Sequence, residues 1–253
     1  LADINIVSGA LLDIRGEAVQ MRGLTGSGNI INTWSSVNTL SIGVGAVSAN
    51  SFNYSGVIGA AVGNISILPN LTGFSGALTN STASQPITLI KNGLGSQILA
   101  GDNLYSGQTT INAGTLSLAT TTGYAQYKTP QFNIASGATL DFYVPAGINE
   151  TQNGAIFTGG GTITKTGAGN LTWGPSTSPG APSTSGIAYF KMLAGSLIDV
   201  QAGTFTGANS YRSNYVDNFS SLNIASGATF AGIEGYVRVD ALTGSGSVIT
   251  GWN

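Results

Sequence analysis

The sequence predicts an all-β chain folded as a parallel β-helix, a solenoid in which each coil pairs with the coils above and below it. Three observations favour this fold. One strand–turn–strand unit occurs three times, its apolar residues alternate with the two-residue period of a half-buried strand, and no window shows the period of an amphipathic helix. A sandwich or a barrel has no reason to reuse one such unit, so the repeats favour the solenoid.

One strand–turn–strand unit recurs along the chain. Residues 132–141 and 222–230 share the letters Asn-Ile-Ala-Ser-Gly-Ala-Thr, and residues 4–13 contain Asn-Ile-Val-Ser-Gly-Ala in the same position. Each copy is a short alternating run, a tight Ser-Gly turn and a second alternating run, which is typical of two half-buried strands joined at a bend. The side chains expected to point inward and to stack in columns are Ile134, Leu140, Ile224 and Phe230.

The two ends of the chain carry the same unit. Residues 1–34 align with residues 219–252 without a gap, so that the two Leu-Thr-Gly-Ser-Gly runs coincide. The copy that starts at residue 132 is followed by Thr-Gly-Gly-Gly-Thr in the equivalent place. We therefore expect the terminal coils to have similar cross-sections. The tryptophans expected in core columns are Trp34, Trp173 and Trp252.

A second pair of related segments lies between the ends. Residues 111–116 and 200–205 resemble each other, and each lies about twenty residues before a copy of the Asn-Ile-Ala-Ser-Gly-Ala unit. Roughly the second half of the chain is therefore two related blocks with a period of about ninety residues. At about 20 residues per coil and about 4.8 Å between coils, the chain would form ~12 coils, a rod ~60 Å long.

The composition suits stacked β structure. Charged residues make up 7% of the chain, against about 25% in an average soluble protein. There are 38 glycines, the other polar residues are mostly Ser, Thr and Asn, and the net charge is −2. Uncharged side chains can lie above one another in ladders without like-charge repulsion. The low charge argues against nucleic acid as a partner, and the 42% hydrophobic content argues against disorder.

Several residue types and segments are absent from the sequence, and each absence excludes a class of site or function. The chain has no cysteine and no histidine, which excludes a disulfide framework, a thiolate metal site and a Ser-His-Asp triad. No apolar run approaches the roughly 20 residues that span a bilayer, so we expect no membrane insertion by this segment. The chain begins with Leu1 instead of Met, and we interpret residues 1–253 as one β-helix domain from a longer, repetitive protein.

One stretch carries the letters of a known repeat. Residues 87–95 read Ile-Thr-Leu-Ile-Lys-Asn-Gly-Leu-Gly, and residues 99–118 read Leu-Ala-Gly-Asp-Asn-Leu-Tyr-Ser-Gly-Gln-Thr-Thr-Ile-Asn-Ala-Gly-Thr-Leu-Ser-Leu. Together they resemble the autotransporter-associated β-strand repeat, and residues 161–172 are a second, partial match. The resemblance implies a right-handed parallel β-helix in a secreted protein of the bacterial cell surface.

Three stretches interrupt the strand pattern. Residues 174–186 are rich in Pro, Ser and Gly, whereas residues 120–131 and 208–221 carry tyrosines. The two tyrosine-bearing stretches follow equivalent Gly-Thr strands, so they should leave the rod on the same side. Tyrosine rings pack against apolar sugar faces while their hydroxyls form hydrogen bonds. The candidate glycan-binding residues are Tyr124, Tyr127, Tyr211, Arg212 and Tyr215. The alternative interpretation is that these rings only cover the strands beneath them.

Signals of catalysis are weak. The carboxylates are scattered, and neither Asp-Asp nor Asp-x-Asp occurs. The one grouping comparable to a polysaccharide lyase or hydrolase site is Asp199, Arg212 and Asp217, with Asp141 and Lys191 conceivably near. The Gly-Gly-x-Gly-x-Asp motif of calcium-binding β-rolls is missing. We therefore expect no catalytic residue, no metal site and no cofactor.

The leading hypothesis is a non-enzymatic extracellular structural protein, a segment of a β-helical stalk, adhesin or fibre. A carbohydrate-binding β-helix is the alternative, and a polysaccharide lyase or hydrolase is the third hypothesis. Unpaired edges at the matching ends invite pairing with further coils or, end to end, with a second copy. The other expected partner is a cell-surface or plant-type polysaccharide.

Overall fold

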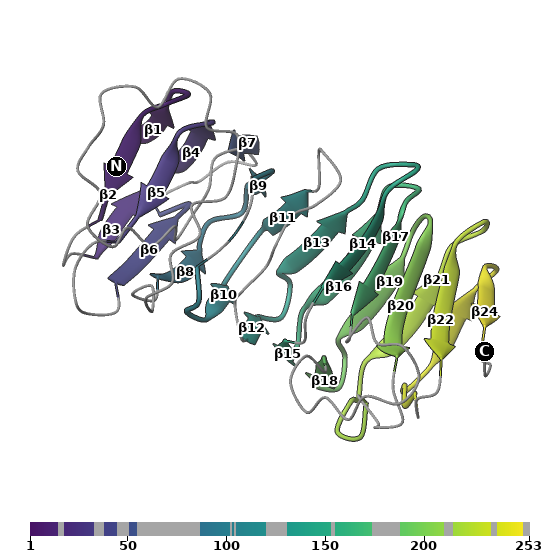
Figure 1. Ribbon diagram of the computed structural model, residues 1–253. Helices are drawn as coiled ribbons and strands as arrows, with labels where there is room; N and C mark the ends of the chain where they lie inside the picture. Colours follow the sequence, from purple (N-terminus) through teal and green to yellow (C-terminus); the bar gives the residue numbers. More distant parts are fainter. Residues whose placement is uncertain are drawn as a thin grey trace, which may run out of the picture.

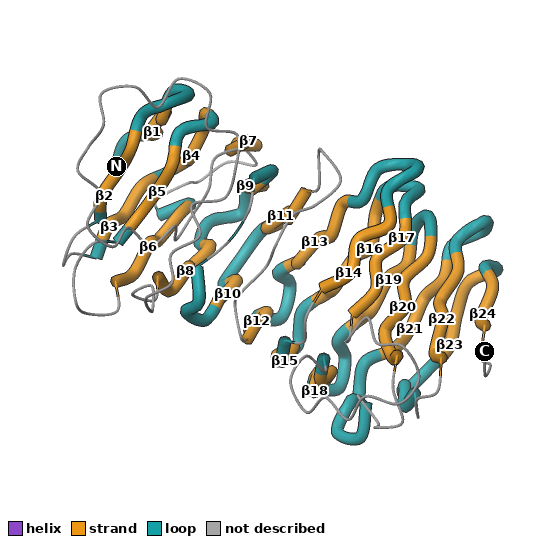
Figure 2. Tube along the Cα trace, in the orientation of Figure 1, coloured by secondary structure: helices purple, strands orange, loops and turns teal. Residues whose placement is uncertain are grey.

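The structure, a computed structural model, is an elongated solenoid of parallel β-strands (Figures 1 and 2). It describes residues 1–14, 18–32, 38–44, 51–54, 87–101, 103, 105–119, 131–152, 155–173, 188–209, 215–233 and 237–249. Every strand pairing among these residues is parallel, and none of these residues is helical. The all-β parallel β-helix expected from the sequence is confirmed.

The strands lie in two long sheets and two shorter ones. The ten-stranded sheet contains, in spatial order, β1 (Asp3–Ile6), β4 (Gly23–Gly26), β7 (Ser51–Tyr54), β9 (Ser96–Leu99), β11 (Thr115–Ala119), β13 (Thr139–Tyr143), β16 (Thr162–Thr166), β19 (Leu197–Val200), β21 (Ser221–Ile224) and β23 (Leu242–Gly244). The seven-stranded sheet contains β18 (Tyr189–Met192), β15 (Ile156–Gly159), β12 (Gln131–Ile134), β10 (Thr109–Ile111), β8 (Ile87–Lys91), β6 (Asn38–Ile42) and β3 (Val19–Met21). The five-stranded sheet contains β14 (Asn149–Gln152), β17 (Asn170–Trp173), β20 (Thr204–Asn209), β22 (Thr229–Ile233) and β24 (Ser247–Ile249), and a two-stranded sheet contains β2 (Leu11–Asp13) and β5 (Asn29–Ile31).

One coil passes through three sheets in turn. The chain runs from β12 in the seven-stranded sheet to β13 in the ten-stranded sheet and β14 in the five-stranded sheet, and then returns to β15, which pairs with β12. In this part of the rod each of the three sheets therefore gains one strand per coil, and only the ten-stranded sheet continues through every described coil. The colours of Figure 1 follow this order from the N-terminal end of the rod to the C-terminal end.

The coils differ in length. Thr115 pairs with Ser96, nineteen positions earlier, whereas Ser96 pairs with Ser51, forty-five positions earlier. The ten-stranded sheet contributes one strand to each coil, so the described residues form ten coils. The prediction of about twelve coils, which assumed a constant coil length, is therefore wrong. β7 and β9 pair directly, so no other strand of the ten-stranded sheet lies between them.

Inward side chains fill the interior of the rod. Alternation along each strand sends one residue inward and the next outward, as in β12, where Phe132 and Ile134 are buried and their neighbours are half-buried. The predicted inward side chains within the described residues are all buried, with exposed fractions of 2% or less: Ile134, Leu140, Trp173, Ile224 and Phe230.

Four aromatic rings stack inside the rod, and we call Phe132, Phe157, Phe190 and Tyr215 the aromatic ladder. The successive ring centroids are 5.2, 4.7 and 4.6 Å apart, and the ring planes differ by 4°, 12° and 6°. Direct strand pairing of Phe132 with Phe157, and of Phe157 with Phe190, sets this spacing. Each such ring pair contributes about 0.5–1.5 kcal/mol beyond the burial of its area.

The repeated unit forms a corner of the coil. Gly26, Gly159 and Gly244 have φ values of 100°, 104° and 100°, in the left-handed region that favours glycine. At each position a Cβ atom would collide with the carbonyl oxygen of an isoleucine on the preceding coil. Glycine therefore lets the two coils approach. The three glycines follow the three copies of the repeated unit in equivalent places, so the copies aligned in the sequence form the same local structure.

The copies occupy different corners of the rod. In the copies at the two ends, the first strand is β1 or β21, and both belong to the ten-stranded sheet. In the copy at residue 132 the first strand is β12 of the seven-stranded sheet, and only the second strand, β13, lies in the ten-stranded sheet. The unit thus encodes a bend between two faces and not a particular face.

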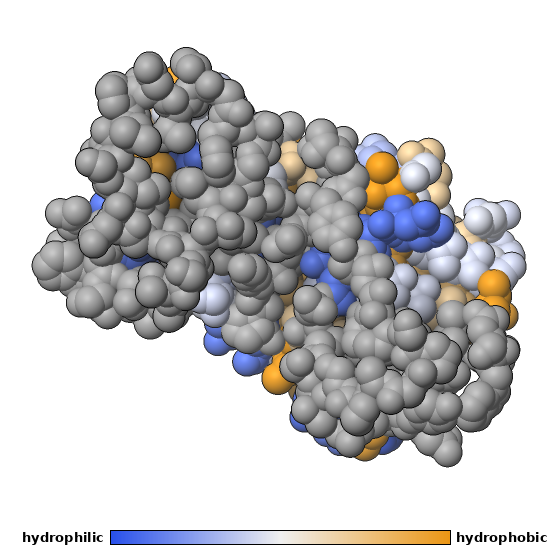
Figure 3. Space-filling view, in the orientation of Figure 1, coloured by the Kyte–Doolittle hydropathy of each residue, from blue (hydrophilic) through white to orange (hydrophobic). Residues whose placement is uncertain are grey.

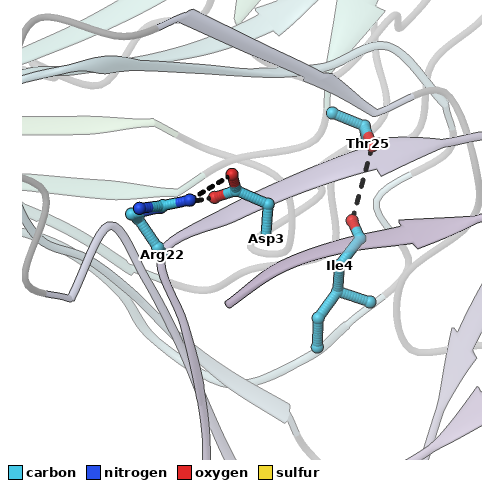
Figure 4. Close-up of polar contacts among 4 residues, drawn as sticks. All are labelled: Asp3, Ile4, Arg22 and Thr25. Atoms are coloured by element: carbon cyan, nitrogen blue, oxygen red, sulfur yellow. Dashed lines mark hydrogen bonds and ion pairs between the residues drawn. The ribbon is translucent and has the colours of Figure 1, made fainter. Parts of the chain in front are cut away.

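Side chains also join adjacent coils at each copy. The Thr25 hydroxyl lies 3.3 Å from the Asn5 side-chain oxygen and 3.4 Å from the Ile4 carbonyl oxygen, the second contact being drawn in Figure 4. The other two copies repeat this Asn–Thr contact with distances of 3.5 and 3.0 Å. In the first copy, Arg22 additionally donates two hydrogen bonds to Asp3, at 2.9 and 2.7 Å, which lower the pKa of that carboxyl group (Figure 4).

Candidate functional site

Only one of the five predicted glycan-binding residues is among the residues that the structure describes. Tyr215 is described, and its assignment to a glycan site is wrong: its side chain is 0% exposed, and its ring stacks 4.6 Å from that of Phe190. Burial also raises the pKa of Tyr215 well above its ordinary value. A ring enclosed in the aromatic ladder cannot stack on a sugar. The candidates that lie outside the described residues are Tyr124, Tyr127, Tyr211 and Arg212.

The charged residues grouped by the sequence analysis lie on two faces. Asp141 on β13 and Asp199 on β19 occupy half-buried outward positions of the ten-stranded sheet, separated in the register by Thr164. Two steps between paired strands place them about 10 Å apart along the rod. Lys191 lies on β18, the edge strand of the seven-stranded sheet, and its Nζ is 3.6 Å from Oδ2 of Asp217. The four residues therefore do not form one site.

Hydroxyl and amide donors bind the two outward carboxylates. Asp141 accepts one hydrogen bond from Ser117 on the preceding coil, at 2.6 Å. It accepts two more from Thr164 and Thr166 on the following coil, at 2.9 and 2.7 Å. Asp199 accepts one from an asparagine on the following coil, at 2.7 Å. These contacts make both carboxylates part of a polar ladder that links adjacent coils on the outer face.

Two lysines that the sequence analysis did not single out hold corners together. Lys91 Nζ donates hydrogen bonds to three backbone carbonyl oxygens, two at its own corner and that of Ala113 on the next coil, at 2.7, 2.9 and 3.1 Å. Lys165 repeats this arrangement with Ala202 on the next coil, at 2.8, 2.7 and 3.1 Å. Burial lowers the pKa of each to about 8. Both stand in the pattern Lys-x-Gly-x-Gly, which is the signal that could have found them.

The described surface offers few features of an enzyme. Among the described residues, no three His, Cys, Asp or Glu side chains gather where they could hold a metal ion. Likewise, no part of the chain that the structure describes forms a helix long and apolar enough to cross a membrane. On the face drawn in Figure 3, the coloured hydrophobic residues occur in small groups separated by hydrophilic ones.

Comparisons with known proteins identify one repeat in the chain. A model of the passenger-associated-transport-repeat family matches residues 89–118, which confirms the resemblance drawn from the sequence. The matched segment starts on β8, contains β9 and β10, and ends on β11. Because Leu89 pairs with Thr109, the match covers one complete coil and two strands of the next. No curated protein and no solved structure matches the chain.

Proposed function

We propose that this passenger-repeat β-helix is a non-enzymatic structural segment of a secreted bacterial surface protein, a stalk that holds other parts of that protein away from the cell. One observation carries the proposal: a ladder of parallel strands runs through ten coils from β1 to β23. The match to a repeat associated with passenger transport supports export. A function of this kind needs length and stiffness, and it needs no reactive group.

The stiffness would come from contacts between consecutive coils. Backbone hydrogen bonds join neighbouring strands within each sheet, the aromatic ladder packs along the interior, and the ammonium groups of Lys91 and Lys165 bind carbonyl oxygens of two coils each. Each class of contact repeats along the rod axis, so a load on one coil is shared with its neighbours. In a solenoid of this kind, stability is approximately a sum over neighbouring repeats.

A spacer assay tests the stalk. The chain is placed between an outer-membrane anchor and an epitope on living bacteria, and the distance of the epitope from the membrane is measured by fluorescence localisation. Ten stacked coils should move the epitope outward by roughly 50 Å relative to the same fusion without the chain. A Gly159→Val fusion is the matched control, because a side chain there collides with the preceding coil and should abolish the extension.

Two outcomes of this work would contradict the proposal. The first is an epitope that lies no further from the membrane with the wild-type chain than without it. The second is release of reducing sugars from a polysaccharide by the purified chain, assayed with and without calcium. That release would support the lyase or hydrolase hypothesis.

We also propose that another coil, from the longer protein or from a second copy, covers the last described one. Leu242 and Val248 continue the inner columns of Leu222 and Phe230, and they are 58% and 47% exposed. A heterologous contact of this kind generates filaments and not closed dimers. Light scattering at rising protein concentration tests the second copy: growing particle mass supports it, and a constant mass of one chain contradicts it.

A further inference from the structure

The exposed cations among the described residues are not spread evenly. It has eight Lys and Arg residues, of which the structure describes five. Two of these are the corner lysines, and Arg22 forms a double hydrogen bond with Asp3. The remaining two, Lys191 and Arg238, are both exposed: Lys191 lies on β18, and Arg238 is bonded to Val216, next to the Asp217 that contacts Lys191.

The guanidinium group of Arg238 is held in one orientation. Its Cζ atom lies 4.5 Å from the centre of the Phe219 ring, and its Nη1 donates a hydrogen bond to the Val216 carbonyl oxygen at 3.1 Å. That bond uses one of the five N–H donors of a guanidinium, and no described residue accepts a bond from the others. A stacked guanidinium whose other N–H groups are not bound by any described residue is suited to a planar carboxylate.

The ammonium group of Lys191 is near both an aromatic ring and a carboxylate. Its ammonium group is 6.0 Å from the centre of the Tyr189 ring and 3.6 Å from a carboxylate oxygen of Asp217. The side chains of Lys191 and Asp217 are 46% and 63% exposed. Tyr189 and its register partner Ile156 are each 37% exposed, so an aromatic and an aliphatic side chain lie next to each other on the surface.

Hydrogen bonds to backbone carbonyl oxygens bring these residues together on three consecutive coils. The Phe219 amide donates to the Met192 carbonyl oxygen at 2.9 Å, which joins the second coil to β18. The Asn218 side chain donates to the Arg238 carbonyl oxygen at 2.8 Å, which joins the third coil to the second. The cationic patch, as we call it, consists of Tyr189, Lys191, Asp217, Phe219 and Arg238.

The outer faces of the two long sheets differ in charge. Beyond Lys191, its column on the seven-stranded sheet continues through Thr158, Asn133 and Thr110, which are uncharged hydrogen-bonding residues. The corresponding column of the ten-stranded sheet contains Asp141 and Asp199. A negatively charged polymer would be repelled by the second face. On the first, it would meet cations at one end and a neutral polar track beyond them.

From these observations we infer that the cationic patch is a binding site for an acidic polysaccharide, a chain of uronic acid units. The Arg238 guanidinium binds a uronate carboxylate through two N–H groups, and Lys191 binds a second one. The Tyr189 ring packs against a sugar face, since such faces present C–H groups. This role goes beyond the stalk function and does not depend on it, because a site on the outer face leaves the coils unchanged.

Binding to polygalacturonate, a polyuronate, tests the inference, with dextran as the neutral comparison. The full chain is measured at physiological salt, and we expect polygalacturonate to bind about tenfold or more tightly than dextran. Lys191→Gln and Arg238→Gln should each weaken binding severalfold, and the double variant should weaken it about tenfold or more. Tyr189→Ala should also weaken it. Arg22→Gln is the matched control, because it removes one exposed positive charge near the other end of the rod.

Three results would overturn the inference. One is equal binding of polygalacturonate and dextran. Another is a loss of affinity in Arg22→Gln as large as that in Arg238→Gln, which would show attraction to overall charge only. The third is a double variant that binds like the wild type. If Arg238→Gln fails to fold by circular dichroism, Arg238→Lys replaces it. That variant keeps the charge but loses the planar fork, and it should still bind more weakly than the wild type.

Discussion

The side-chain amide of Gln97 forms two hydrogen bonds with the backbone of Leu24, a residue seventy-three positions earlier. Gln97 Oε1 accepts from the Leu24 N–H at 3.2 Å, and Gln97 Nε2 donates to the Leu24 carbonyl oxygen at 3.0 Å. The strand between them, β7, pairs with β4 at a single register position, Gly26 with Tyr54. The glutamine amide thus replaces strand pairing where the ladder is incomplete.

Replacing Gln97 with Leu should destabilise the protein, although the two side chains are similar in size. The variant leaves the buried N–H and carbonyl groups of Leu24 without these partners, and each such group costs about 1–3 kcal/mol. We expect the free energy of unfolding to fall by about 2–4 kcal/mol, measured by urea denaturation. Gln20→Leu on the exposed surface of β3 is the control and should change it by less than about 0.5 kcal/mol. Equal effects of the two variants would contradict the role assigned to Gln97.

Removing an inner rung of the aromatic ladder should be costly. Phe157 is 0% exposed and stacks on both Phe132 and Phe190, so Phe157→Ala opens a cavity between two rings. We expect a loss of about 3–5 kcal/mol in the free energy of unfolding. Leu94→Ala, at a position that is 68% exposed, serves as the comparison and should have little effect. A loss of less than 1.5 kcal/mol for Phe157→Ala would be far below the cost of such a cavity and would argue against the ladder.

Tyr215→Phe should leave the protein as stable as the wild type or make it more stable. The Tyr215 hydroxyl is buried and has no hydrogen-bond partner among the described residues, so removing it relieves a desolvation cost of about 1 kcal/mol and keeps the ring. Thermal unfolding by circular dichroism measures the change. If this hydroxyl contributed to a surface glycan site, the same variant would lose polysaccharide binding, and we expect no such loss.

Two glycines separate the effect of backbone conformation from the effect of close packing. Gly137 and Gly159 both have positive φ, 79° and 104°, but a Cβ atom meets nothing at Gly137 and collides with the Ile134 carbonyl oxygen at Gly159. Gly137→Ala should cost about 1–2 kcal/mol, the penalty of a left-handed conformation alone. Gly159→Ala should cost clearly more, because the coils must also separate. Equal midpoints of urea denaturation for the two variants would contradict the packing argument.

The corner lysines should make stability depend on pH in the alkaline range. Burial lowers the pKa of Lys91 and Lys165 to about 8, whereas in an unfolded chain it is about 10.4. Between these values the unfolded chain binds more protons than the folded one, so these groups make the free energy of unfolding rise with pH. A Lys91→Met, Lys165→Met double variant should lack this contribution in denaturation curves measured from pH 7 to pH 10.

Lys191→Met is the control for this titration, since Lys191 is exposed and does not lie at a corner. It should keep the pH dependence of the wild type. The prediction is contradicted if the stability of the Lys91→Met, Lys165→Met variant changes with pH as that of the wild type does. That result would show that the carbonyl oxygens compensate fully for the loss of water around the two ammonium groups.

Local sequence determined the building unit of this protein. The letters Asn-Ile-x-Ser-Gly predicted two short strands and a bend, and the structure has that bend at residues 4–13, 132–141 and 222–230. The inward positions of Ile134 and Phe230 followed from alternation, because successive residues of a strand face opposite sides. These features depend on neighbours in the chain, so a reader of the sequence can find them.

Only the tertiary structure decided how the units are stacked. In the ten-stranded sheet, paired residues lie between nineteen and forty-five positions apart in the sequence, so spacing in the sequence does not say which side chains meet. For that reason Tyr215, expected on the surface, is a rung of the aromatic ladder, and Gln97 reaches Leu24 across an incomplete strand pair. The approach of Lys191 to Asp217 likewise depends on which coils are adjacent. Local alternation and the Ser-Gly turn encode the strands and the corner of each unit, whereas the register between coils comes from packing of the whole interior.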